Sequence, residues 1–175
     1  MIKHILITGE IGAGKSTLIQ RLLTHTTRPV YGFITQRMEA DASGFHPIYI
    51  HPAGALERVY TTENRIGMCN SQMHGASLEV FNTLGVRYLD APEDGLIVMD
   101  ELGFMEAKAD LFVQKVFEAL DGRIPVIAAV KARLDVPFLN AVRACPNAAN
   151  FTITPDNRGD LYRQLSAVMD AWASH

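Results

Sequence analysis

Apolar residues along the chain follow two patterns, short continuous runs and faces with helical spacing. The runs predict strands, and apolar residues three or four positions apart predict helices. Predicted strands cover residues 3–8, 30–35, 45–50, 96–99, 125–130 and 151–153, and predicted helices cover residues 14–25, 74–84, 110–120, 137–144 and 161–172. Because most strands alternate with helices, the pattern predicts a mainly parallel sheet.

Two neighbouring strands, 30–35 and 45–50, are joined by a polar segment that contains Gly44, which is typical of a β-hairpin. Pro47 lies in the second of these strands. Proline cannot donate a hydrogen bond to a neighbouring strand, so we expect this strand at an edge of the sheet.

The middle of the chain is less regular. The predicted helix 74–84 is followed by Gly85, which suits a left-handed helix cap. Residues 51–73 carry no clear pattern apart from a possible short strand at 59–61. We therefore predict an α/β fold in one domain, residues 1–175, with three layers and an inserted β-hairpin.

Composition narrows the class of protein. Of 175 residues, 48% are hydrophobic and 20% charged, which is ordinary for a globular domain. A net charge of −3 without a basic run does not favour nucleic-acid binding, and no apolar stretch has the length of a membrane span. Cys69 and Cys145 are isolated, as in proteins with reduced thiols. The first strand leaves no room for a signal peptide, so we expect a cytoplasmic location.

The segment between the first strand and the first helix matches the phosphate-binding pattern G-x-x-x-x-G-K-[ST]. Its glycines allow backbone N–H groups to approach phosphate oxygens, and the following helix adds its positive end. Lys15 can reach the β- and γ-phosphates, and the Ser16 hydroxyl can bind Mg²⁺. The predicted nucleotide-binding residues are Gly9, Glu10, Ile11, Gly12, Ala13, Gly14, Lys15, Ser16 and Thr17.

A second acidic element follows the buried strand 96–99. In a parallel sheet the carboxyl end of a strand faces the ligand crevice, which is where Asp100 and Glu101 lie in this sequence. We expect Asp100 to bind the same Mg²⁺ as Ser16, and Glu101 to orient water for attack on the γ-phosphate. The alternative is that Asp100 only ends the strand and Glu101 is a solvated loop carboxylate.

These residues resemble a known family. Residues 100–106 read DELGFME, similar to the D-E-I-G-x-M-E signature of a P-loop nucleoside-triphosphatase family found in thermophilic bacteria and archaea and in the human cancer-related nucleoside-triphosphatase. Residues 32–35, GFIT, resemble its G-F-x-T strand, and residues 154–161, TPDNRGDL, its T-x-x-N-R-x-x-L segment. The resemblance implies a RecA-like fold and slow hydrolysis of several nucleoside triphosphates with little base selectivity.

The chain departs from the family pattern after residues 32–35. The family continues with a glutamate and an arginine-rich hairpin that contains glycine, whereas this chain continues with QRME. Residues 51–73 have no counterpart in the pattern. Contacts to the substrate from this region can therefore differ in this protein.

Three further cations are candidates for the site. Arg158 could place a positive charge on the transferring phosphoryl group, as an arginine finger supplied in cis. In the alternative, Asn157 caps the last helix and Arg158 pairs with a surface acid. Lys131 and Arg133 follow strand 125–130 at the ligand end of the sheet and could face phosphates or the base, or remain solvated.

Three functions are compatible with these residues. The first is a Mg²⁺-dependent nucleoside-triphosphatase that acts on a nucleoside triphosphate substrate. The second is a small-molecule phosphotransferase, with residues 44–85 holding an acceptor, although no arginine-rich lid is present. The third is a nucleotide-dependent switch or assembly module whose slow hydrolysis serves a protein partner. The sequence leaves the preferred base, the partner and the oligomeric state open.

Overall fold

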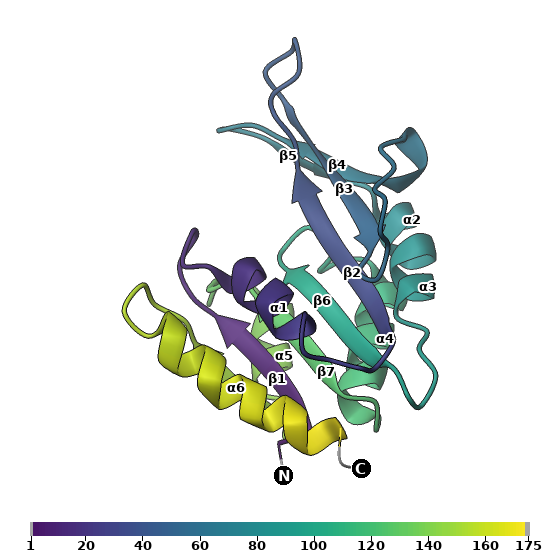
Figure 1. Ribbon diagram of the computed structural model, residues 1–175. Coiled ribbons are helices and arrows are strands. Elements are labelled where there is room, and N and C mark those ends of the chain that lie inside the picture. The colour runs from purple at the N-terminus through teal and green to yellow at the C-terminus, as the bar shows by residue number, and fades with distance from the viewer. Residues whose placement is uncertain (1, 174–175) are drawn as a thin grey trace.

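The computed structural model describes residues 2–173, and its centre is an eight-stranded sheet with the order β5-β4-β3-β2-β6-β7-β1-β8 (Figure 1). The strands are β1 (His4–Thr8), β2 (Val30–Arg37), β3 (His46–Pro52), β4 (Arg65–Cys69), β5 (His74–Ala76), β6 (Leu96–Leu102), β7 (Val126–Val130) and β8 (Ala148–Thr152). The α/β class predicted from the alternating pattern is confirmed.

The parallel part of the sheet runs from β2 through β6, β7 and β1 to β8. One strand, β7, separates β1 from β6, which is the strand order of RecA-like P-loop folds. Every residue of β7 is buried, as expected for a parallel strand covered on both faces. The carboxyl ends of β1, β2 and β6 therefore meet at one edge of the sheet.

Helices cover both faces of this sheet, which gives the three predicted layers. They are α1 (Lys15–Leu23), α2 (Leu78–Val80), the π-helical turn η2 (Phe81–Gly85), α3 (Val86–Tyr88), α4 (Asp110–Asp121), α5 (Pro137–Arg143) and α6 (Arg158–Ala173), with a 3₁₀ turn η1 (Thr62–Asn64). Helices α1 and α6 lie on one face, and α4 and α5 on the other (Figure 1).

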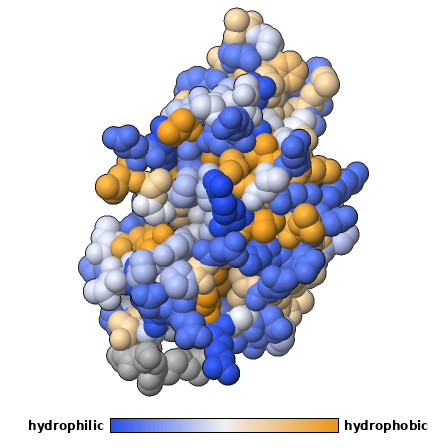
Figure 2. Space-filling model, turned by 90° about the vertical axis from the view of Figure 1, so that its right-hand side faces the viewer, coloured by the Kyte–Doolittle hydropathy of each residue, from blue (hydrophilic) through white to orange (hydrophobic). Residues whose placement is uncertain are grey.

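Strand β1 shows how one strand serves both cores. Ile5 and Ile7 pack with α1 and α6, whereas Leu6 between them packs with the core that includes Phe112 of α4. This follows from the alternation of side chains along a strand. On the outside, the side that carries α2, α3 and α4 presents hydrophilic residues with hydrophobic ones between them (Figure 2).

The antiparallel part of the sheet is larger than the predicted hairpin. Strands β3, β4 and β5 extend it beyond β2, and the β2–β3 connection projects at the top of Figure 1. The expected edge position of Pro47 is wrong, because β3 lies between β2 and β4. Strand β4 comes from the segment without a clear pattern, β5 comes from the start of the predicted helix 74–84, and residues 59–61 form no strand.

The prediction for residues 74–84 is wrong at both ends. His74–Ala76 is strand β5, and the helical segment runs from Leu78 to Tyr88. Gly85 is not a left-handed cap, since its φ of −57° is right-handed helical. A Cβ atom on Gly85 would lie 2.7 Å from the Phe112 ring, so this glycine allows the helix to pack closely on α4.

The ends of other elements differ from the pattern by a few residues. Strand β6 continues to Leu102, past the acidic pair, and β8 begins at Ala148 rather than at residue 151. No helix within residues 2–173 is long and apolar enough to cross a membrane.

Candidate active site

The phosphate-binding pattern forms the loop between β1 and α1. Gly14 ends the loop with φ +106°, a left-handed conformation that other residues rarely adopt, and Lys15 begins the helix. At the other end, a Cβ atom on Gly9 would lie 2.6 Å from the Ile153 carbonyl oxygen. The glycines are therefore needed both for the turn and for the close approach of the segment that follows β8.

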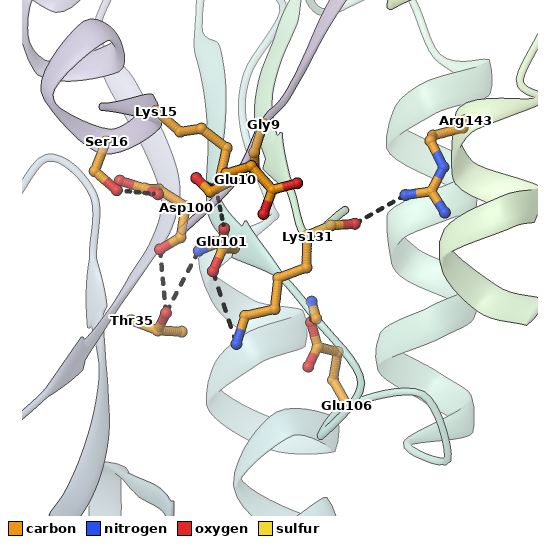
Figure 3. Close-up of polar contacts among 11 residues, drawn as sticks. Gly9, Glu10, Lys15, Ser16, Thr35, Asp100, Glu101, Glu106, Lys131 and Arg143 are labelled. Atoms are coloured by element: carbon orange, nitrogen blue, oxygen red, sulfur yellow. Dashed lines mark hydrogen bonds and ion pairs between the residues drawn. The ribbon is translucent and has the colours of Figure 1, made fainter. Parts of the chain in front are cut away.

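The Lys15 side chain lies over its own loop and is only 8% exposed (Figure 3). Its ammonium donates to the carbonyl oxygens of Gly9 at 2.9 Å and Glu10 at 3.3 Å. The same nitrogen lies 3.3 Å from Glu101 Oε2. The predicted phosphate-binding lysine and the predicted catalytic carboxylate are therefore in direct contact.

Ser16 and Asp100 also meet, although 84 positions separate them in the chain. The Ser16 hydroxyl donates to Asp100 Oδ1 at 2.8 Å. Burial raises the pKa of Asp100, and the bond from Ser16 acts in the opposite direction. A hydroxyl and one carboxylate are hard oxygen donors that suit Mg²⁺, which usually takes one or two protein carboxylates and keeps its remaining positions for water and phosphate.

The Asp100–Glu101 pair points to the site because of a local irregularity in β6. Along a regular strand two successive side chains face opposite sides of the sheet. Asp100 is opposite Ala129 of β7 and Leu102 is opposite Val130, so the register shifts at Glu101. Such β-bulges redirect a side chain. Thr35 of β2 supports this turn, since its hydroxyl lies 3.4 Å from both the Asp100 carbonyl oxygen and the Glu101 nitrogen.

Arg158 approaches the loop from the start of α6. Its Nε donates to the Ala13 carbonyl oxygen at 2.7 Å, and Nη2 lies 3.3 Å from that of Gly12. No surface acid pairs with it within residues 2–173. Asn157 organises the preceding turn instead, accepting from the Thr154 N–H at 2.8 Å.

The two cations after β7 lie on the side of the site away from Ser16. Lys131 Nζ is 3.8 Å from Glu101 Oε1 (Figure 3). Arg133 donates from Nε to Asp135 at 2.9 Å and stacks on the Phe104 ring at 4.9 Å. Arg143 of α5 holds this segment, because it donates to the Lys131 carbonyl oxygen at 2.9 Å.

Glu106 is the carboxylate that the sequence analysis left without a role. It is 4% exposed, and it accepts a hydrogen bond from the Gly103 N–H (Figure 3). Burial raises its pKa to about 7, although the hydrogen bond from Gly103 and the positive charge of Lys131 both lower the pKa. The sequence could have pointed to Glu106, because Glu106 ends the DELGFME segment. Nothing in the sequence points to Arg143, because it lies in a helix far from every motif and resembles a surface residue.

The strand order and the contact of the loop with the acids of β6 define a P-loop fold of the nucleoside-triphosphatase type. The family model described as NTPase matches residues 4–166, so the chain belongs to this family. It is 30% identical over 171 residues to the nucleoside-triphosphatase THEP1 of Thermotoga sp. (strain RQ2), covering 94% of each chain. It is also 30% identical over 196 residues to the cancer-related nucleoside-triphosphatase homolog of Mus musculus, covering 98% of each.

Two solved structures have the same fold. The crystal structure of THEP1 from Aquifex aeolicus superposes with a TM-score of 0.74 at 22% identity, over 95% of this chain and 98% of that one. The solution structure of a human cancer-related nucleoside triphosphatase gives 0.66 at 22% identity, over 97% and 98%. The family and the fold suggested by the short motifs are confirmed.

Replacing Glu106 with Gln changes how stability depends on pH. Its pKa is about 7 in the folded chain and near the ordinary 4.5 in the unfolded one. The folded state therefore binds the proton more tightly, and wild-type stability falls as pH rises from 4.5 to 7. Between pH 5 and 8 we expect Glu106→Gln to gain roughly 2 kcal/mol in unfolding free energy relative to wild type.

Urea unfolding at several pH values measures this difference, with Glu93→Gln, an exposed turn residue, as the control. The control should follow the wild type throughout. The same pH slope in wild type and in Glu106→Gln would show that Glu106 ionises in the folded chain as it does in the unfolded one. Lys131 and Glu101 are the charged groups that face Glu106, and both remain in the variant.

Proposed function

We propose that the protein is a Mg²⁺-dependent nucleoside-triphosphatase that hydrolyses ATP, GTP and other nucleoside triphosphates to the diphosphate and phosphate with low base selectivity. The observation that carries this proposal is the double contact between the P-loop helix and the end of β6. Lys15 meets Glu101 at 3.3 Å and Ser16 meets Asp100 at 2.8 Å. One cation, one hydroxyl and two carboxylates thus converge on the start of α1, where a phosphate group is favoured.

Binding and positioning would come from the P-loop. The backbone N–H groups between Glu10 and Thr17 surround the β- and γ-phosphates, and Lys15 turns its ammonium from the loop carbonyls to the γ-phosphate. Ser16 and Asp100 would hold Mg²⁺, which when bound neutralises charge on the phosphate oxygens. The raised pKa of Asp100 fits a buried carboxylate that lacks a full positive partner of its own.

Glu101 is the residue placed to orient the attacking water. It is the second of the two acids, it is partly exposed, and the bulge in β6 brings it beside Lys15. A carboxylate that accepts a hydrogen bond from water can align it with the γ-phosphorus. Lys131 lies at the other oxygen of Glu101 and limits the ways in which the carboxylate can rotate.

The groups that converge at the site support low base selectivity, because none of them is assigned to the nucleotide base. The converging groups would all act on phosphates, metal or water, and the relatives are named nucleoside-triphosphatases, without reference to a base. Phosphate release from ATP, GTP, CTP and UTP, with and without Mg²⁺, tests the proposal directly.

Two substitutions separate binding from turnover. We expect Lys15→Ala to abolish Mg²⁺-dependent phosphate release and to weaken nucleotide binding, because the ammonium would contact the phosphates both in the bound substrate and in the transition state. We expect Glu101→Gln to lower kcat by about 10²-fold or more while the nucleotide Kd stays near wild type, because Glu101 acts on the attacking water and does not hold the phosphates.

Lys108→Ala and Glu118→Gln are the matched controls, since both residues are exposed and outside the site. Both should retain wild-type rates. Loss of binding together with turnover in Glu101→Gln would remove Glu101 from the catalytic role, and unchanged turnover in Lys15→Ala would overturn the proposal itself.

We propose further that Arg158 supports catalysis by holding the P-loop. Its guanidinium donates to two loop carbonyl oxygens, those of Ala13 and Gly12. In a phosphate-binding loop the N–H groups face the anion, so a donor on the carbonyls stands outside the anion site. This position is suited to fixing the loop conformation, whereas an arginine finger touches the transferring phosphoryl group.

The variant Arg158→Ala distinguishes the two roles through steady-state kinetics. A loop-holding arginine predicts a KM for nucleoside triphosphate raised about tenfold, with a smaller decrease in kcat, because each lost charged hydrogen bond is worth roughly 1.5 kcal/mol or more. A decrease in kcat by about 10³-fold at unchanged KM would assign Arg158 as the finger instead. Arg163→Ala, an exposed arginine of the same helix, is the control.

A further inference from the structure

A cavity of about 660 Å³ opens beside the P-loop, and the proposed hydrolysis uses only one end of it. Gly9, Glu10, Lys15 and Glu101 line that end. The rest extends under the antiparallel part of the sheet, toward β4 and β5. Its volume lies within the range of about 300–1,000 Å³ that is typical of small-molecule sites. A single attacking water needs far less room.

The cavity lies on the side from which the γ-phosphate is attacked. Glu101 lines it, and Glu101 is the carboxylate that we assign to the attacking water. Asp100 and Ser16, the residues assigned to the metal, are absent from its lining. A molecule in the part of the cavity that extends toward β4 and β5 would therefore stand next to the water position and beyond the P-loop residues that line the other end.

The inner wall of the cavity is apolar. Ile48 of β3, Ile66 of β4, Phe81 and Met105 line it. Near the opening lies an aromatic pair, His74 and Phe104, whose rings meet edge to face with centroids 5.2 Å apart. Burial of an apolar or aromatic group against such a wall makes the free energy of binding more favourable, whereas a bare ion or a water molecule has no apolar surface to bury.

Four cations line the cavity, together with the carboxylates of Glu10, Glu101 and Glu106; the cations are Lys15, Arg37, Lys131 and Arg133. Lys131 and Arg133 lie within 5.4 Å and 4.9 Å of the Phe104 ring centroid, and each also has a carboxylate neighbour. Arg37, the last residue of β2, differs from them, because the ion pairs of residues 2–173 leave its guanidinium without a carboxylate. Thr35, two residues earlier on the same strand, lines the cavity with it.

We propose that this cavity binds a second small molecule, an organic anion whose apolar or aromatic body lies on the Ile48–Ile66–Phe81 wall and whose phosphate or carboxylate group is held by Arg37. An arginine guanidinium binds either group through paired hydrogen bonds, and Arg37 lines the cavity without an ion-pair partner within residues 2–173. The bound molecule excludes water from the Glu101 side and so slows hydrolysis.

Phenyl phosphate is a suitable probe, since it joins an aromatic ring to a phosphate. Ligand-observed NMR titration of the protein loaded with Mg²⁺ and a non-hydrolysable ATP analogue, which fills the γ-phosphate position as well, keeps the probe out of the P-loop. We expect saturable binding that Arg37→Ala weakens about tenfold or more and that Arg163→Ala leaves unchanged. Benzyl alcohol, which lacks the anion, should bind more weakly than phenyl phosphate. Equal affinity of wild type and Arg37→Ala, or no binding to the loaded protein, would overturn the proposal.

A kinetic experiment tests the position of the ligand and rests on the proposed hydrolysis. Phenyl phosphate should lower kcat for ADP formation at saturating ATP, and the same concentration should have little effect on Arg37→Ala. Inhibition that raises KM alone would show competition at the P-loop and contradict the proposal. If the wild type forms no ADP even without the probe, the proposed function fails, whereas the NMR titration still decides whether the cavity binds the anion.

Discussion

The site depends on the need to neutralise the buried ammonium of Lys15. A lysine that is 8% exposed must find partners inside the protein, because an unpaired buried charge costs several kcal/mol. It has the carbonyl oxygens of Gly9 and Glu10 and the carboxylate of Glu101. These contacts tie the P-loop to β6. A triphosphate offers the ammonium several stronger acceptors, and we propose that substrate binding exchanges the internal partners of Lys15 for phosphate oxygens and leaves Glu101 to contact water.

The sheet makes this contact possible. Strands β1 and β6 are both parallel to β7, so the loop after β1 and the acids of β6 reach the same edge from opposite sides of one strand. Two apolar cores fix the strands between the helical layers. The polar groups therefore hold their positions on a rigid frame, and the bulge at Glu101 supplies the adjustment that a regular strand would not allow.

The parts of the protein that could be predicted from the sequence are those whose chemistry lies in a short segment. The P-loop is contiguous, and the buried strand before Asp100 points that carboxylate to the correct edge of the sheet. The parts that failed depend on distant residues. Pro47 is interior because β4 pairs with β3 on its outer side, and Gly85 lies within a helix that packs too closely on Phe112 for a larger residue. Nor does any local pattern show that Arg158 reaches the loop carbonyls or that Arg143 holds the segment of Lys131.

We propose that Lys15, Ser16, Asp100 and Glu101 act together on one triphosphate and one metal ion. A crystal structure with Mg²⁺ and a non-hydrolysable ATP analogue tests it most directly. We expect the metal to lie between the Ser16 hydroxyl and Asp100, and the Lys15 ammonium to contact the γ-phosphate. We also expect Glu101 to contact a water next to the γ-phosphorus. A triphosphate bound away from the P-loop, or a Lys15 that keeps its carbonyl partners while the γ-phosphate lies elsewhere, would contradict it.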